Sequence, residues 1–523
     1  MNKQSENPPK KSRWLRLLFV FTCLVTAIFL FYAEEDLRGY LAWHSYQRQL
    51  ESKGAKLEWQ AVVPAPVPDD QNFALAPIVV TSYGNLLTTD GKLIPFNRRD
   101  ANYVNRMSMP LTVDADEPPK NGIGNWQTAT ISDLSAWQDY YRKLSAITNE
   151  FPVPPLPQSP AADVLLALGK YDSAIAELRQ AAQLPDSRFP TDYDNEDPAE
   201  ILLPYLASLK RSSQTLQLRA IAELQNNQPD KAFDDIKLML RLTDSVRTEP
   251  FIISHLVRFV MVQFALQPIY EGLAAHQWSD AQLAEMDSEL GQLDFLADFK
   301  HSINGERAAN VRIIAWAARN QGKLQSFLGN LDNGKQNTQS LEFDLAVLHL
   351  IPRGWFYQND INTAKLDELW LTGPVNDDQQ IVSPSLTEQA ANSIRRSFRH
   401  TGPSNFLAAL LVPEFSGYIR RVAYAQNAVN LARVAIALDR YRLANGSYPA
   451  SLDSLSPLFL KEVPHDIIND QPLQYHATQD GLFILYSVGW NQKDDGGTVA
   501  FNKGSKNVID AARGDWVWRY PQK

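Results

Sequence analysis

The sequence predicts a mostly α-helical protein with an α+β domain at its C-terminus and one transmembrane helix at its N-terminus. Three observations support this fold class. Residues 17–33 form an uncharged apolar run, stretches between 131 and 319 repeat apolar residues with a helical period, and two alternating runs flank Asp480 and Gly481. The 523 residues suffice for about three domains at roughly 150 residues each.

Charge is distributed unevenly along the chain. The formal net charge is −9, from 50 Lys and Arg against 59 Asp and Glu. Without the charged residues that precede the apolar run, 45 basic side chains remain against 58 acidic ones; the residues left out of this count are Lys3, Glu6, Lys10, Lys11, Arg13 and Arg16. This excess of acidic residues after the apolar run argues against a protein that coats nucleic acid or anionic lipid. We therefore expect no nucleic-acid partner.

The first element in order is a predicted transmembrane helix over residues 17–33, at the short end of what spans a hydrocarbon core. Trp14 and Tyr32 lie near its ends, where amphipathic rings favour the membrane interface. The alternative is a cleaved signal peptide, but the exit sequence Phe-Tyr-Ala-Glu at 31–34 lacks the small-residue pattern of a cleavage site. We therefore predict an uncleaved signal anchor.

The orientation of this anchor follows from the charges on its two sides. The tail 1–16 is basic, whereas Glu34, Glu35 and Asp36 follow the apolar run. Basic residues are retained on the cytoplasmic side of a membrane. We predict a single-pass protein of the bacterial inner membrane, with residues 1–16 in the cytoplasm and the body in the periplasm.

The only cysteine of the sequence, Cys23, lies inside the predicted span. The rest of the chain therefore has no disulfide, no thiol nucleophile and no cysteine metal ligand. A body exported without disulfides must depend on the size of its hydrophobic core, which a chain of this length permits.

Residues 34–130 form the next predicted region. A helix continues outward from the span and ends near Gly54, with an apolar side that we expect to contain Leu37, Tyr40, Leu41 and Leu50. Three prolines between 64 and 68 then predict a stiff extended segment. Residues 75–130 show no long helical period. We predict an irregular region with a few short strands, one of them in the β-branched run 78–81.

Residues 131–415 are predicted to form a helical domain. Two stretches, 165–184 and 220–242, resemble the second helices of tetratricopeptide repeats; the matching residues are Gly169, Tyr171, Ala174 and Ala181. The equivalent alanines, Ala174 and Ala232, are 58 positions apart, so an irregular helical bundle is the alternative that we favour over a regular array. Residues 252–273 are the most apolar helix after the anchor. Because His255, Arg258 and Pro268 interrupt that stretch, we predict a buried central helix and not a second span.

Catalytic motifs give weak signals. Residues 329–335 have the spacing of a phosphate-binding loop, but Gln336 stands where Ser or Thr would hold magnesium. The acidic segment 192–197 has calcium-like spacing without the glycine and glutamate of an EF-hand, which favours a solvated loop. The eight histidines form no His-x-x-x-His pair, and there is no Gly-x-Ser-x-Gly motif. We therefore assign no catalytic or cofactor-binding residue.

Residues 416–523 form the predicted C-terminal α+β domain. A helix over 422–445 has one apolar face, while Asn430, Arg433, Ala437 and Arg440 form the opposite face. Gly446 is the expected C-cap of this helix. The alternating runs 473–477 and 482–488 around Asp-Gly predict a β-hairpin with one buried face.

Four segments in this order carry a family resemblance: ALDRYRLANGSYP at 437–449, PLQY at 472–475, LYSVG at 485–489 and DDGG at 494–497. They resemble the soluble part of the major pseudopilin of type II secretion, over about 100 of the 523 residues. The resemblance implies a long helix packed on a small antiparallel sheet. Pseudopilins carry this helix at their own processed N-terminus, whereas here it follows a large body, so we expect neither prepilin-type cleavage nor assembly into a pseudopilus.

The same resemblance implies a calcium site, because major pseudopilins bind calcium in the loop after this hairpin. The matching oxygen ligands are Asn491, Asp494 and Asp495. The alternative is a solvated Asp-Asp-Gly-Gly turn without a metal.

The anchor followed by the proline-rich segment and Asp69-Asp-Gln-Asn-Phe73 resembles large membrane-anchored envelope proteins of bacteria such as Verrucomicrobia and Planctomycetes, which implies no particular activity. Together these features predict an envelope scaffold or protein-interaction protein with a pseudopilin-like C-terminal module, linked to secretion or envelope assembly. Its expected partners are the membrane and other envelope proteins. The alternative is an exported hydrolase whose site combines scattered carboxylates and histidines.

Overall fold

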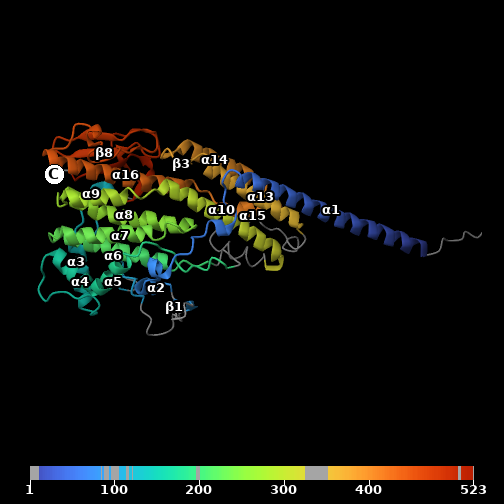
Figure 1. The fold of residues 1–523 in the computed structure, drawn as a ribbon, viewed down its shortest axis with the longest axis horizontal. Helices are drawn as coiled ribbons and strands as arrows, with labels where there is room; N and C mark the ends of the chain where they lie inside the picture. The colour runs from blue at the N-terminus through green and yellow to red at the C-terminus, as the bar shows by residue number, and fades with distance from the viewer. Residues whose placement is uncertain are drawn as a thin grey trace, which may run out of the picture.

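The computed structural model describes residues 11–83, 85–87, 93–95, 105–113, 117–120, 122–195, 201–323, 351–504 and 508–521. As predicted, the protein is mostly helical, with a long apolar N-terminal helix and small antiparallel sheets in its C-terminal region (Figure 1). The body is elongated. The C-terminal sheet lies at the end opposite to the free end of the N-terminal helix.

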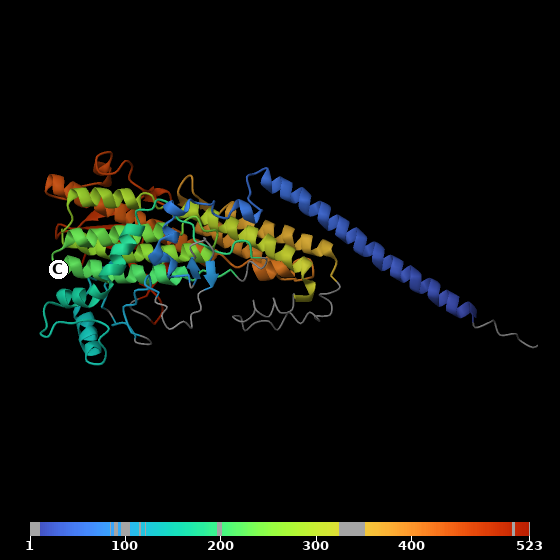
Figure 2. The same ribbon diagram turned by 60° about the horizontal axis from the view of Figure 1, so that its bottom comes forward.

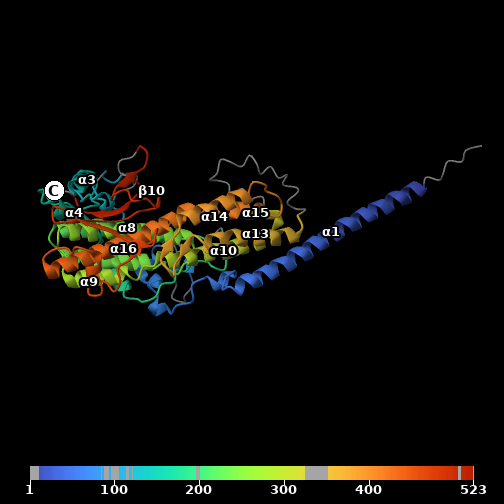
Figure 3. The same cartoon turned by 90° about the horizontal axis from the view of Figure 1, so that it is seen from above.

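Helix α1 (Lys11–Glu51) is a single uninterrupted helix that contains the predicted span and its predicted continuation. It projects far from the body in each view (Figures 2 and 3). The large apolar side chains of the predicted span are exposed, for example Phe29 at 71% and Phe31 at 47%. Gly54, with φ +86°, follows shortly after the end of the helix. A residue in the left-handed conformation ends a helix, and glycine adopts this conformation with little strain.

The predicted packing face of α1 beyond the predicted span is wrong for three of its four residues and right for Leu50, which is buried. Leu37 is 60% exposed and Leu41 57% exposed, and Tyr40 is exposed as well. The buried stripe joins Leu50 to Glu35, Gly39 and Trp43 at helical spacing. The apolar pattern failed in the first part of this stripe because the contact there relies on a glycine and a hydrogen-bonded carboxylate, which a search for apolar residues passes over.

The region after α1 is irregular, as predicted, and contains short elements. The run 78–81 does not form a strand: Pro77 starts one helical turn, and the carbonyl of Ala76 accepts hydrogen bonds from Val79 and Val80. Ile78, Val79 and Val80 are all buried, so the burial of the whole turn outweighs β propensity. The elements are η1 (Trp59–Ala61), η2 (Asp69–Gln71), η3 (Phe73–Leu75), α2 (Pro77–Val80), β1 (Asn85–Leu87), β2 (Leu93–Pro95) and η4 (Trp126–Thr128).

The helical body follows the prediction. The apolar positions of both tetratricopeptide-like stretches are buried on α5 and α7. Helix α7 packs against α6, whereas α4 packs on α3 and α6. The helices of the body are α3 (Ser135–Ser145), α4 (Pro160–Leu168), η5 (Gly169–Tyr171), α5 (Asp172–Ala181), α6 (Tyr205–Gln225), α7 (Pro229–Asp244), α8 (Ile252–Ala274), α9 (Asp280–Leu290), α10 (Phe295–Arg319), η7 (Gln321–Lys323), α13 (Arg353–Leu371), α14 (Pro384–Ser397) and α15 (Phe406–Leu411).

Helix α8 is the buried central helix that the sequence predicts. It passes the length and hydropathy test for a membrane span, yet most of it is buried inside the body. Its Arg258 has no exposed surface and is neutralised by Asp298 of α10, while its Nε donates to the Thr243 carbonyl at 2.9 Å. A buried cation with these partners fits the core of a soluble bundle.

The C-terminal region consists of helix α16 (Ser416–Asn445) and short antiparallel strands. Gly446, with φ +82°, caps α16 as predicted. The predicted hairpin is formed by β7 and β8, whose register pairs Ala477 with Phe483, and β11 adds to the other edge of β8. The remaining short elements are β3 (Val375–Asn376), β4 (Ile381–Val382), η8 (Leu452–Leu455), β5 (His465–Asp466), β6 (Gln471–Pro472), β7 (Gln474–Ala477), β8 (Phe483–Ser487), β9 (Val499–Phe501), β10 (Ile509–Gly514) and β11 (Trp516–Arg519).

One hydrophobic core runs from the helical body into this C-terminal region. Helix α16 packs on α8, α9 and α10 and also on β8, β10 and β11. Trp518 of β11 is fully buried, 5.1 Å from Trp126 and 5.5 Å from Tyr270 between ring centroids. The predicted boundaries at 130 and 415 therefore mark changes of sequence character within a continuous core.

Candidate functional site

The junction between α1 and α13 fixes the apolar helix to the body. The two helices run side by side in the same direction, because Gly39 lies against Gly354 and Tyr46 lies near Lys365 further along both helices. At Gly39 and Gly354 the backbones approach so closely that a Cβ atom on either glycine would lie well inside van der Waals contact of the other helix. Close backbone approach through small residues gives a tight and specific crossing.

Polar contacts complete this junction. Trp355 Nε1 donates to Glu35 Oε2 at 2.9 Å, and the backbone N–H of Gly354 donates to Asp36 Oδ1 at 2.7 Å. Hydrogen bonds from Arg38 and then from Trp355 and Gln358 hold the pKa of Glu35 below its usual value. The acidic residues that indicated the topology in the sequence therefore also bind the first turn of α13.

The structure brings together only part of the predicted calcium site. Asn491 Nδ2 donates to Asp495 Oδ2 at 2.8 Å, so these two side chains lie side by side. Asp494 is turned toward the sheet, where its Oδ1 accepts from Tyr486 Oη at 3.1 Å and from the Gly496 backbone at 2.9 Å. In the described part of the chain, no group of three or more His, Cys, Asp or Glu side chains is spaced to hold a metal ion.

A residue that the sequence pattern did not reveal, Asp515, organises this loop. It is 1% exposed, and its carboxylate accepts backbone N–H groups from Asp495 at 3.2 Å, Gly497 at 2.7 Å and Thr498 at 3.2 Å. Burial raises the pKa of Asp515, and the nearby Asp495 carboxylate adds to the rise, while the three N–H groups oppose it. Asp515 follows the loop by about twenty positions, so spacing alone gave no signal for it.

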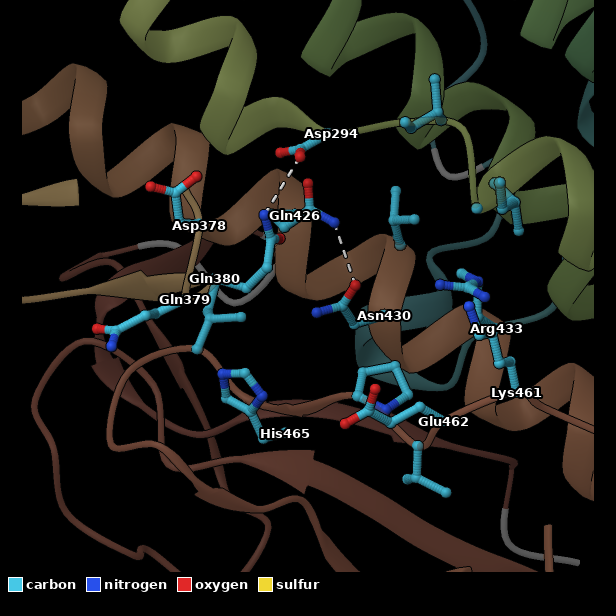
Figure 4. A pocket seen from close by; sticks show the side chains of 17 residues that line it. Asp294, Asp378, Gln379, Gln380, Gln426, Asn430, Arg433, Lys461, Glu462 and His465 are labelled. Carbon is cyan, nitrogen blue, oxygen red and sulfur yellow. Dashed lines mark hydrogen bonds between the residues drawn. The ribbon is translucent and has the colours of Figure 1, made fainter. Parts of the chain in front are cut away.

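A polar cavity with a volume of about 610 Å³ lies where three parts of the chain meet. They are the corner between α9 and α10, the turn between β3 and β4, and the face of α16 with the segment that leads into β5 (Figure 4). The side chains around it are mostly charged groups and amides, including Asp294, Asp378, Gln380, Asn430, Arg433 and Lys461.

The predicted second face of α16 forms one wall of this cavity. Gln426 Oε1 accepts from the Phe295 backbone at 2.8 Å, and Gln426 Nε2 donates to Asn430 Oδ1 at 3.1 Å. One turn further along, Arg433 Nε donates to Asp287 of α9 at 2.7 Å. The polar stripe along this helix thus joins α16 to the helical body instead of facing bulk water.

A second cavity, of about 420 Å³, lies between α8 and the C-terminal strands and contains a histidine that pairs with a carboxylate. His276, with φ +52°, has its Nδ1 atom 3.3 Å from Oδ1 of the fully buried Asp439. The same oxygen accepts from Arg442 Nε at 2.7 Å and from Tyr448 Oη at 3.2 Å. Asp439 therefore has a structural role at the end of α16 that accounts for its burial.

Two weaker sequence signals have different outcomes. The phosphate-loop spacing at 329–335 lies outside the described residues. In the acidic segment, the backbone of residues 193–195 is held by Arg312 of α10, whose guanidinium donates to all three carbonyl groups, and by Trp59 Nε1. The described part of this segment is therefore tied to the body through its backbone.

Comparisons of the chain with protein-family models, with curated proteins and with solved structures found no match.

Proposed function

We propose that this protein is a membrane-anchored envelope scaffold, whose helical body and pseudopilin-like C-terminal module bind other envelope proteins. The observation that carries the proposal is the continuity of α1. Its exposed apolar segment, which is long enough to span a membrane, continues without a break into residues 34–51, the stem, which contacts α13. An exposed apolar surface of this size is stable in lipid and costly in water.

The rest of the architecture supports a binding role. The junction of Glu35, Gly39 and Gly354 fixes the stem to α13, and the continuous core fixes the C-terminal strands to the helical body. The long helix packed on a three-stranded antiparallel sheet supports the pseudopilin-like assignment. The hydrolase alternative has less support, because the pairing of His276 with Asp439 is explained by the structural bonds of Asp439.

We expect the body to lie outside the cytoplasm, because the basic residues precede the span and acidic residues follow it. Alkaline phosphatase, which is active only in the periplasm, should therefore be active when fused after Lys523. A fluorescent protein that matures only in the cytoplasm should stay dark at the same position. Fluorescence from that second fusion would refute the topology. Crosslinking in intact membranes, followed by recovery of the full chain, then tests for envelope partners.

We also propose that the loop after β8 binds calcium through Asn491, Asp494 and Asp495. The contact between Asn491 and Asp495, beside the buried Asp515, supports this proposal, since calcium is held by several oxygen ligands. Binding requires Asp494 to exchange its hydrogen bond with Tyr486 for the ion.

Calcium at about 100 times its dissociation constant is expected to stabilise the protein by about 2.7 kcal/mol, which raises the melting temperature by several degrees. The double variant Asp494→Ala with Asp495→Ala should lose this shift. The matched control is the exposed acidic pair Asp69→Ala with Asp70→Ala, which should keep it. Because Asp494 also accepts hydrogen bonds, the quantity to compare is the shift on adding calcium. If calcium does not change the melting temperature of the wild type, the loop is a turn that binds no metal.

A further inference from the structure

The cavity of about 420 Å³ between α8 and the C-terminal strands has apolar walls and a single carboxylate. Glu271 of α8 is the only Asp, Glu, Lys or Arg among the described residues that line it. The apolar walls are formed by Ile131, Leu224, Ala274, Ala275, Leu482 and Pro521. Apolar walls with a few polar groups are typical of cavities that bind small molecules.

Glu271 is a buried carboxylate that has no cationic partner. It is 5% exposed, and in the described part of the chain no Lys, Arg or His side chain lies within ion-pair distance of it. Arg519 of β11 lines a different cavity. Burial raises the pKa of Glu271, and hydrogen bonds from Ser132, Gln267 and Gln225 oppose the rise. A buried carboxylate is costly without a cation, so a ligand that brings a positive charge would stabilise it.

Hydrogen bonds hold the carboxylate of Glu271 in one orientation. Its Oε1 accepts from Ser132 Oγ at 2.6 Å, from the Ser132 backbone N–H at 3.1 Å and from Gln267 Nε2 at 2.8 Å. All three bonds end on the same oxygen. Because each carboxylate oxygen has its own acceptor positions, Oε2 can still accept from a ligand.

Two amide side chains of the cavity use their donors on the protein backbone. Gln225 Nε2 donates to the Ser132 carbonyl at 3.0 Å, and Gln277 Nε2 donates to the Leu224 carbonyl at 3.0 Å. Within the described residues, neither amide oxygen accepts a hydrogen bond. These two side chains therefore offer acceptors to a ligand.

His276 and Tyr520 supply further acceptors. His276 Nδ1 lies 3.3 Å from Asp439 Oδ1, and a neutral imidazole that donates from Nδ1 presents Nε2 as an acceptor. The hydroxyl of Tyr520 is buried and has no hydrogen-bond partner among the described residues. The remaining polar side chain, Asn227, is an exposed amide that can present either of its atoms. A ligand with several N–H donors matches this set of acceptors.

We propose that this cavity binds a small molecule that carries a primary ammonium group on an apolar body. The ammonium group would donate to Glu271 Oε2 and to the amide oxygens of the cavity, and the apolar body would lie against Leu224 and Leu482. The volume of the cavity is in the range of small-molecule sites. This binding goes beyond the scaffold function and does not depend on it.

Isothermal titration calorimetry on the full chain in detergent tests the proposal with three ligands of similar size. They are phenethylamine, a cation at neutral pH, phenethyl alcohol, which is neutral, and hydrocinnamate, an anion. We expect the amine to bind at least about tenfold more tightly than the alcohol, because only the amine brings a positive charge to Glu271. Equal binding of amine and alcohol, preference for the anion, or no heat with the amine up to about 10 mM would overturn the proposal.

Glu271→Gln removes the charge and keeps the shape of the side chain. This variant should bind phenethylamine about tenfold or more weakly than the wild type and should bind phenethyl alcohol unchanged. The matched control is Glu58→Gln, at an exposed position outside the cavity, which should bind the amine as the wild type does. Equal amine affinities in the two variants would show that Glu271 is not the partner of the cation and would refute the site.

A second variant tests the cavity without altering a buried group. Ile131 is 40% exposed and precedes Ser132, a hydrogen-bond partner of Glu271. Ile131→Lys places an ammonium group at the cavity and should weaken phenethylamine binding by about tenfold or more, through repulsion and competition for Glu271. The control is Ile147→Lys, at a position that is 82% exposed and outside the cavity. Unchanged amine binding in Ile131→Lys would place the binding elsewhere and contradict the proposal.

Discussion

Replacing Gly354 with alanine is expected to open the junction between α1 and α13. The new Cβ atom would overlap the backbone carbonyl of Glu35, which cannot move aside as the end of a flexible side chain can. Overpacking of this kind costs about 1–3 kcal/mol, and here it also strains the hydrogen bonds of Glu35 and Asp36. We expect residues 34–51 to lose their protection in hydrogen–deuterium exchange.

The matched control for this variant is Gly417→Ala in the first turn of α16, where a Cβ atom would have no neighbour within 4 Å. Alanine should be neutral there, or more stable by up to about 1 kcal/mol. The two variants add the same methyl group to a helix and differ only in surroundings. If the backbone amides of residues 34–51 exchanged as slowly in Gly354→Ala as in the wild type, the close glycine contact would not be what holds these residues against α13.

The stability of the protein is expected to fall as pH rises from about 4 to about 8, and Asp367 of α13 should account for a large part of this dependence. Asp367 has no exposed surface, and neither of its carboxylate oxygens has a hydrogen-bond partner among the described residues. Burial raises the pKa of Asp367 to about 8. The Arg307 guanidinium opposes this rise, while Glu306 and Glu368 add to it.

The direction follows from proton binding. Between about pH 4 and about pH 8 the folded protein keeps a proton on Asp367 that the unfolded chain has released, so each pH unit costs up to about 1.4 kcal/mol of stability. Asp367→Asn keeps the shape and cannot ionise. We expect its melting temperature to match the wild type near pH 4 and to exceed it increasingly toward pH 8.

Melting curves of both proteins from pH 4 to 8 measure this difference directly. Other buried carboxyl groups titrate in the same range, since burial raises the pKa of Glu249 to about 7 and that of Glu306 to about 6. They are present in both proteins, so the difference between the two curves isolates Asp367. Parallel curves over the whole range would show that Asp367 is ionised in the folded protein. Glu388→Gln, at an exposed position of α14, should behave as the wild type.

Local signals predicted the elements that depend on neighbouring residues in the sequence. The uncharged run predicted α1, and Gly446 predicted the end of α16. The alternating runs around Asp480 and Gly481 predicted the hairpin of β7 and β8. Each of these features follows from periodicity or a capping preference within a few residues.

Contacts between distant segments were not predictable in this way. Gly39 and Gly354 are separated by most of the chain. A glycine inside a helix normally predicts a less stable helix and not a contact site. Asp515 acts on the loop through backbone N–H groups, which no pattern of side chains reveals. The polar cavity combines three segments, so the sequence predicted the helix face that carries Asn430 and Arg433 but not the cavity that this face lines.

The continuity of α1 has a mechanical consequence. A helix of 41 residues is about 60 Å long, and a hydrocarbon core takes up about half of that length. In the membrane-anchored protein that we propose, no break in the helix separates the apolar half of α1 from the half that is held against α13. The tilt of the proposed span in the bilayer therefore determines the inclination of the body. A force on the distal C-terminal strands exerts a torque on that span. Fluorescent dipoles placed on α1 and on α16 in oriented bilayers should accordingly change their angles together when a partner pulls on the C-terminus.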